Sequence, residues 1–183
     1  MSRVLIFAGA NGAGKTTFAK SILEPNLVFI NADDIQRQER LADIEAGQKA
    51  LKLIDDSISK KINFAFETTL AGIGLKKRFE HLKRRRYFVE IYYLFVYPVE
   101  LLLERIKERL KKGGHPVPEV DVKRRYGRSL KNFWETYRFY ADVWKIINNN
   151  EVEARTIAIG RKEYFLMLDE PEFRIFKEKV KNG

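Results

Sequence analysis

The sequence predicts an α/β fold in which a parallel sheet is flanked by helices. Runs of apolar and β-branched residues alternate with segments of helical periodicity over most of the chain. The first apolar run leads directly into a glycine-rich loop and an amphipathic segment. Towards the C-terminus, two short β-like runs flank a Gly-Arg pair, which indicates a C-terminal β-hairpin. We expect these elements to form a single domain over residues 1–183.

The first half of the chain divides into three strand–helix pairs. The strand positions are short apolar runs, whereas the helix positions carry apolar residues at spacings of three and four. The longest of these helices contains Leu41, Ile44, Leu51, Ile54 and Ile58 at helical spacing. The expected strands cover residues 4–8, 26–30 and 64–67, and the expected helices cover residues 16–23, 35–60 and 74–84.

The second half begins with an aromatic and β-branched strand that Pro98 stops. The helix after it ends at Gly113-Gly114, which is a normal C-terminal stop. A later segment carries aromatic residues at helical spacing, which we interpret as core rather than as a base-stacking surface. These are Tyr126, Phe133, Trp134, Tyr137, Tyr140 and Trp144. The expected elements are a strand over residues 87–97, helices over 99–111 and 119–147, hairpin strands over 155–159 and 163–168 with Gly160-Arg161 between them, and a last helix from about Pro171.

The glycine-rich loop has the pattern Gly9-x-x-x-x-Gly14-Lys15-Thr16 between the first strand and the first helix. In this context the pattern is that of a phosphate-binding P-loop, so we expect a P-loop NTPase-type sheet. The glycines allow the backbone N–H groups to converge on phosphate oxygens, and the helix N-terminus adds positive potential. Lys15 suits the outer phosphates of ATP, and the Thr16 hydroxyl suits Mg²⁺. The expected nucleotide-binding residues are Gly9, Ala10, Asn11, Gly12, Ala13, Gly14, Lys15, Thr16 and Thr17.

Composition excludes several classes of function. The chain has no cysteine and two histidines, which excludes disulfides, thiol catalysis and a histidine-rich metal site. The absence of a leader or a long apolar stretch favours a cytoplasmic protein without a membrane partner. The formal charge of +10 indicates anionic partners such as phosphates. We interpret the basic run at residues 83–86 as a solvated helix end, so a nucleic-acid partner is not favoured.

Carboxylates follow the second and third expected strands. Ligands of open α/β sheets bind beyond the carboxyl ends of the strands, so Asp33, Asp34 and Glu67 should emerge beside the P-loop. We assign Asp33 to the proton of an attacking hydroxyl, and Asp34 to N-capping of the next helix. Glu67 is expected to serve Mg²⁺ or the acceptor substrate, and its alternative role is capping of the following turn.

A basic segment over residues 105–128 resembles a lid. Arg105 and Arg109 lie one helical turn apart, and Arg124, Arg125 and Arg128 lie on the next helix. Glycines and prolines at residues 113–118 separate the two groups and permit hinge motion. Arginines on such a lid would neutralise charge that develops as the γ-phosphoryl group moves. The alternative is an ordinary charged surface on two amphipathic helices.

With these motifs in place, the chain resembles the zeta toxin family of P-loop kinases, in particular its small stand-alone members. The matching pieces lie within residues 3–134. They are Gly9–Thr17, Ile30-Asn31-Ala32-Asp33, Phe66-Glu67-Thr68-Thr69, and the stretch from Arg105 through Gly113-Gly114-His115-x-Val117-Pro118 to Arg124-Arg125-Tyr126-x-Arg128-Ser129-Leu130-x-Asn132.

The resemblance implies ATP- and Mg²⁺-dependent phosphorylation of a nucleotide sugar, UDP-N-acetylglucosamine. It places the catalytic aspartate on Asp33 and substrate contacts on Asp33, Glu67 and Thr69. The family's better-known large toxins have differently spaced lids, so we select Arg109 and Arg125 as the catalytic arginines beside Lys15, with Arg105 and Arg124 next. A small antitoxin protein is a further partner that the resemblance implies.

Three functions compete at this point. The leading one is transfer of the γ-phosphoryl group of ATP to a hydroxyl of a small anionic acceptor. The second is an ATP-hydrolysing switch or binding module, and the third is a kinase of nucleic-acid ends. They differ in what should stimulate ADP release, which is an acceptor molecule, a partner protein or a polynucleotide end, respectively.

Overall fold

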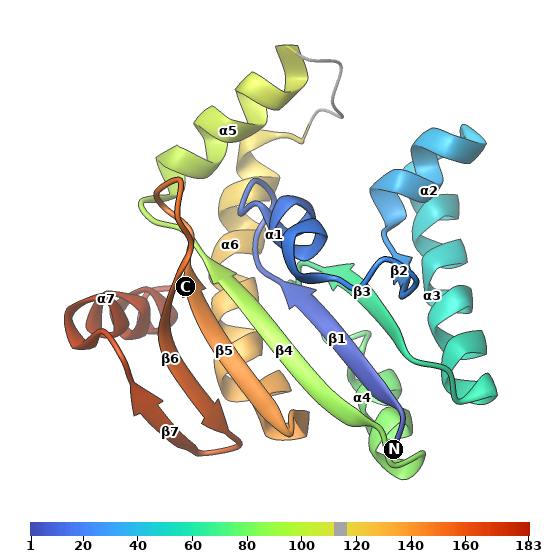
Figure 1. Cartoon of the computed structure of the whole chain (residues 1–183). Coiled ribbons are helices and arrows are strands. Elements are labelled where there is room, and N and C mark those ends of the chain that lie inside the picture. Colours follow the sequence, from blue (N-terminus) through green and yellow to red (C-terminus); the bar gives the residue numbers. More distant parts are fainter. Residues whose placement is uncertain (112–116) are drawn as a thin grey trace.

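A computed structural model describes residues 1–111 and 117–183 of the chain. Within these residues, seven strands form one sheet with the spatial order β2-β3-β1-β4-β5-β6-β7 (Figure 1). The strands are β1 (Arg3–Ala8), β2 (Val28–Ile30), β3 (Phe64–Thr68), β4 (Phe88–Phe95), β5 (Val143–Asn148), β6 (Arg155–Arg161) and β7 (Tyr164–Met167). The helices are α1 (Lys15–Ile22), α2 (Ala32–Glu39), α3 (Asp43–Lys60), α4 (Lys76–Arg84), α5 (Val99–Lys111), α6 (Glu119–Glu135) and α7 (Glu170–Lys181), with a 3₁₀ turn, η1 (Tyr137–Tyr140).

The first five strands are parallel, and the last two complete the sheet in antiparallel orientation. In the central ladders Val4 of β1 is opposite both Phe64 of β3 and Val89 of β4. Because parallel strands share one direction, the residues that follow β1, β2, β3 and β5 all emerge at the same edge of the sheet. The expected α/β class and the C-terminal hairpin are therefore confirmed.

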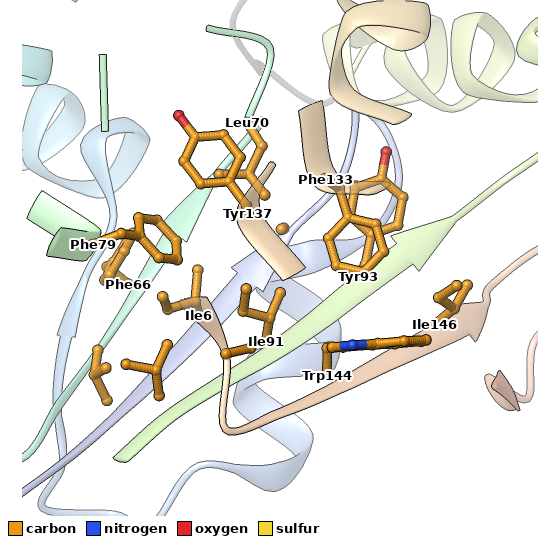
Figure 2. Packing of buried hydrophobic residues seen from close by; sticks show 14 of the residues in the cluster. Ile6, Phe66, Leu70, Phe79, Ile91, Tyr93, Phe133, Tyr137, Trp144 and Ile146 are labelled. Atoms are coloured by element: carbon orange, nitrogen blue, oxygen red, sulfur yellow. The ribbon is translucent and has the colours of Figure 1, made fainter. Parts of the chain in front are cut away.

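Two apolar layers cover the faces of the sheet. On one face, β-strand side chains pack against α3, α4, α6 and α7, and on the other they pack against α1 and α5. Figure 2 shows part of the larger layer, in which Tyr93 and Phe133 stack with ring centroids 4.3 Å apart. Phe133, Tyr137 and Trp144 are fully buried and Trp134 is 8% exposed, while Tyr126 and Tyr140 pack partly buried against the same layer. The aromatic set therefore belongs to the core, as expected. Such rings contribute large buried areas and directional ring contacts.

The expected helix over residues 35–60 is two helices. Helix α2 ends at Glu39, Arg40 adopts a left-handed conformation with φ of 55°, and α3 begins at Asp43. The helical spacing of apolar residues continues across this break, because α2 and α3 both bury a face against the same layer. No glycine or proline stands between them to indicate the interruption.

The expected helix over residues 119–147 was wrong in its second half. Helix α6 ends at Glu135, and residues 143–148 form β5, which pairs with β4 along its length. Trp144 therefore lies on a strand and not on a helix. The edge of β4 would be unpaired without β5, and pairing with it stabilises the segment more than a helix would. The β-branched and aromatic residues of the segment also suit a strand.

The remaining differences are small. The hairpin turn falls on Lys162 and Glu163 rather than on Gly160-Arg161, because Arg161 pairs with Tyr164. The last helix begins at Glu170, with Asp169 as its N-cap and Pro171 in its first turn. All helices in the described part of the chain are too short or too polar to span a bilayer.

Candidate active site

The P-loop connects the buried strand β1 to helix α1. Gly14 precedes the helix in a left-handed conformation with φ of 83°, and the Gly14 carbonyl accepts the hydrogen bond of Phe18 N at 3.0 Å. Ala13 N donates to the Ala10 carbonyl at 3.2 Å and closes the turn in front of the helix. The loop therefore leads directly into a helix N-terminus, which is a favourable position for a phosphate.

Gly12 shows why a side chain is excluded from the loop. Its φ is +82°, and a Cβ atom there would lie 2.8 Å from the Leu102 carbonyl oxygen and 3.2 Å from Ile106 of α5. Leu102 and Ile106 are buried. Helix α5, which carries Arg105 and Arg109, thus packs directly on the P-loop.

Lys15 and Thr16 meet Glu67 at the ends of β1 and β3. Lys15 is only 6% exposed, and its Nζ donates to the Ala10 carbonyl at 3.0 Å and lies 3.7 Å from Glu67 Oε1. The Thr16 hydroxyl donates to Glu67 Oε2 at 2.6 Å. Glu67 does not cap the following turn, because Thr68 and Thr69 accept the N–H groups of that turn.

Asn31 completes this cluster and was not selected from the sequence. Its Nδ2 lies 3.3 Å from Thr16 Oγ1 and 3.2 Å from Glu67 Oε2. Its Oδ1 accepts the hydrogen bond of Asp33 N and so caps α2. The assignment of this cap to Asp34 was therefore wrong: Asp34 lies inside the first turn and pairs with Arg37. The signal in the sequence is that Asn31 is a polar, cap-forming residue directly after an apolar strand.

Asp33 lies on the opposite side of a groove from the arginines of α5 and α6. Its Oδ2 is 3.6 Å from Arg109 Nη1, and both side chains are about half-exposed. Arg125 of α6 lines the same groove, which has a volume of about 380 Å³. The P-loop contributes Asn11, while Gln36, Asp43 and Asp121 add polar groups and Val117 and Pro118 add apolar ones.

Two further arginines of the predicted lid, Arg105 and Arg124, are bound to other groups of the protein. Arg105 Nη2 donates to the Asn150 carbonyl at 2.8 Å, and burial lowers the pKa of Arg105. Arg124 pairs with Asp121 on its own helix. Gly113, Gly114, His115 and Pro116, on which the lid interpretation partly depends, lie outside the described residues.

A second groove of about 370 Å³ runs beside Glu67. Glu67 and Thr69 line it together with small and apolar residues of α3 and of the segment after β3. Two of the predicted substrate residues therefore share one wall. Thr17, in contrast, is exposed on α1, whereas Ala10 and Ala13 of the loop are buried.

The oxygen ligands around Thr16 are compatible with a magnesium ion. Mg²⁺ prefers oxygen donors, and Thr16 and Glu67 bring a hydroxyl and a carboxylate together beside the phosphate loop. Within the described residues, no group of three histidine, cysteine or acidic side chains forms a metal site. The phosphates of a nucleotide would have to supply the other ligands, as is usual for Mg²⁺.

Comparison with known proteins agrees with this architecture. A family model described as an AAA domain, AAA_33, matches residues 4–125. The chain belongs to this family. An uncharacterized protein of Haemophilus influenzae is 36% identical over 130 residues, which cover 68% of this chain and 93% of that protein. The AAA_33 match includes β1, the P-loop, β3 and helix α5.

Solved structures with low sequence identity share the fold. A chain of the AvrRxo1-ORF1:-ORF2 complex with ATP has a TM-score of 0.75 and 15% identity, and the match covers 96% of this chain but 63% of the other. A structure from the PezAT toxin-antitoxin system of Streptococcus pneumoniae has a TM-score of 0.56 and 14% identity, with 100% and 87% covered. The chain thus spans less than two thirds of the AvrRxo1 chain. The P-loop NTPase-type fold of this AAA_33 protein is common to these structures.

Proposed function

We propose that this protein is a kinase that transfers the γ-phosphoryl group of ATP to a hydroxyl of a small anionic acceptor. The observation that carries the proposal is the contact between the P-loop and an acidic residue: Lys15 and Thr16 both face Glu67, and Thr16 is hydrogen-bonded to it at 2.6 Å. A phosphate loop with adjacent carboxylates and facing arginines suits phosphoryl transfer, which depends on positioning and on charge neutralisation.

Each residue has a role in this proposal. The P-loop amides and Lys15 hold the β- and γ-phosphates, and Thr16 with Glu67 would hold Mg²⁺, which neutralises phosphate charge when bound. Asp33 accepts the proton of the attacking hydroxyl from across the groove. Arg109 and Arg125 face the transferring group, and Glu67 and Thr69 contact the acceptor from the second groove.

The acceptor class follows from the resemblance to zeta toxins, which implies a nucleotide sugar, and UDP-N-acetylglucosamine is the first compound to test. The groove offers Arg109 and Arg125 to its phosphates, beside Asp33, Asp43 and Asp121. The fold likeness to a PezAT structure supports a small antitoxin protein as an additional partner. The net charge of +10 is compatible with both.

The test is a screen of ADP release with ATP and Mg²⁺ over nucleotide sugars, nucleosides and oligonucleotides. Stimulation by a nucleotide sugar, together with a phosphorylated product by mass spectrometry, would support the proposal. Stimulation by oligonucleotide ends would indicate the alternative kinase, and ADP release that no acceptor changes would indicate a hydrolytic switch. Lys15→Ala protein is the control for contaminating ATPases.

A further inference from the structure

Three consecutive asparagines stand at the carboxyl end of β5, and each one is bound to a different part of the molecule. Asn148 Nδ2 donates to Glu172 of α7 at 2.7 Å. Asn149 Nδ2 donates to the Ala13 carbonyl of the P-loop at 2.8 Å. Asn150 pairs through its side chain with both backbone groups of Tyr97, at 2.9 and 2.7 Å. Only Asn149 contacts the phosphate loop in these hydrogen bonds.

Asn149 is itself held rigidly. Its backbone N–H donates to the Phe95 carbonyl at the end of β4, at 2.9 Å, so its side chain extends from a fixed point of the sheet. A Cβ atom on Gly14 would lie 2.5 Å from Asn149 Nδ2, which no ordinary packing permits. The amide of Asn149 therefore occupies the space that the missing side chain of Gly14 leaves.

The carbonyl oxygens of the loop have to point away from a bound phosphate. The Ala10 carbonyl accepts from Ala13 N and Lys15 Nζ, and the Gly14 carbonyl accepts from Phe18 N. The Ala13 carbonyl stands between them, and its side-chain donor is Asn149. Peptide geometry is planar, so fixing this carbonyl also fixes the orientation of the Gly14 N–H group in the same peptide unit.

We propose that Asn149 is a positioning residue that holds the P-loop in its phosphate-binding conformation. The inference rests on the proposed function in so far as ATP is the ligand that the loop receives. Asn149 acts through Ala13 and Gly14 and does not itself take part in the chemistry. Removal of its amide leaves a buried carbonyl without its donor, which costs more than an average hydrogen bond is worth.

The experiment compares Asn149→Ala and Asn149→Asp with Asn148→Ala. Asn149→Asp keeps the size of the side chain but replaces the N–H donor by an oxygen that repels the Ala13 carbonyl. Asn148→Ala is the matched control, because it removes the hydrogen bonds to Glu172 of α7 and from Asn150 N, neither of which ends on the P-loop. Thermal unfolding without nucleotide shows whether each variant is folded.

Titration calorimetry with the non-hydrolysable analogue AMP-PNP and Mg²⁺ should show a Kd about tenfold higher for both Asn149 variants. The Asn148→Ala protein should bind as the wild type does. Wild-type Kd in folded Asn149→Ala and Asn149→Asp proteins would overturn the proposal, and so would an equal loss in Asn148→Ala, since that would mean a general effect on stability.

Hydrogen exchange of peptides that cover residues 9–14 gives a readout without nucleotide. These amides should exchange faster in both Asn149 variants and at the wild-type rate in Asn148→Ala. Unchanged exchange in the Asn149 variants would overturn the positioning role. If the wild-type protein did not bind AMP-PNP, the proposed function would fail, while this exchange measurement would still decide on Asn149.

Discussion

Arg109 of α5 and Asp33 of α2 face one another across the groove, with Nη1 of the guanidinium 3.6 Å from Oδ2 of the carboxylate. Both side chains are about half-exposed, so the pair contributes less than about 1 kcal/mol to stability. Its importance lies in its position. In the proposed kinase, the γ-phosphate would attract Arg109 away from Asp33 and leave the carboxylate available to an acceptor hydroxyl.

Substitution of Lys15 tests the phosphate loop. Lys15→Ala should lower turnover by about 100-fold or more, because the Lys15 ammonium group neutralises phosphate charge in the transition state and the backbone N–H groups of the loop do not replace it. ATP affinity should fall as well, as measured by calorimetry. Lys20→Ala, an exposed change on the same helix, is the control. Equal ATP affinity and activity in Lys15→Ala and wild type would contradict the assignment.

Asp33→Asn tests the general base. The amide keeps the shape of the side chain but does not accept a proton, so turnover should fall by about 10²–10⁴-fold while ATP still binds. Asp34→Asn is the control, since Asp34 pairs with Arg37 in the same helical turn. An active Asp33→Asn enzyme beside an inactive Asp34→Asn enzyme would assign the base to the other carboxylate.

The two groove arginines should act on the transition state more than on ATP binding. Arg109→Ala and Arg125→Ala are expected to lower kcat by about 10- to 1,000-fold with a smaller change in the Kd of ATP. Lys107→Ala, on the exposed face of α5, should behave as the wild type does.

The predicted motion of residues 105–128 has a test of its own. Hydrogen exchange of peptides from residues 105–128 should slow when a non-hydrolysable ATP analogue and the acceptor are added together. Slow exchange already without ligand, combined with full turnover of both arginine variants, would indicate an ordinary charged surface.

A buried ionic cluster at the other end of the sheet predicts acid sensitivity. Glu90 is 6% exposed and accepts hydrogen bonds from Tyr92 at 2.6 Å, Arg3 at 2.8 Å and Lys145 at 3.0 Å. Burial raises the pKa of Glu90, but these three partners together outweigh burial, so its pKa lies below the ordinary value of 4.5. A lowered pKa in the folded state stabilises the protein above pH 4.5, and this stabilisation is lost as the pH falls through the lowered pKa.

Urea unfolding measures this effect. Wild type should be more stable than Glu90→Gln by about 1–3 kcal/mol at pH 7, and the difference should shrink as the pH falls below 4.5. Glu80→Gln, a partly exposed change on α4, is the control. A difference between wild type and Glu90→Gln that is the same at pH 7 and in acid would show that the charge of Glu90 does not stabilise the fold.

The elements that local pattern predicts well are those in which pattern and packing agree. The predicted bounds of strand β1 and of the start of α1 are correct to within a residue. The reason is that the apolar strand, the glycine pattern and the start of the helix follow one another directly in the sequence. Helix α5 begins at Val99, as expected, directly after Pro98. Two predicted helices, over residues 35–60 and 119–147, were too long. In both, the apolar periodicity continues past the residue at which the real helix ends, and no glycine or proline marks that end.

The wrong prediction of a helix over residues 143–147 is also the reason why the contact of Asn149 with the P-loop was not expected. A residue interpreted as lying just beyond a helix gives no reason to expect contact with the P-loop, whereas a residue at the carboxyl end of a parallel strand beside β4 does. Asn31 differs, because a polar residue directly after a strand also suits a helix cap. Its contacts with Thr16 and Glu67 across the sheet edge are what assign it to the site.

The fold class and the phosphate loop can be predicted from the sequence, since both depend on residues that are neighbours along the chain. The contacts of Glu67 with Thr16, of Arg109 with Asp33 and of Asn149 with Ala13 become evident only in three dimensions. These pairs come from separate elements, and strand order and helix packing bring them together. Such contacts depend on how the elements are arranged around the edge of the sheet, and the spacing of residues along the chain does not give that arrangement.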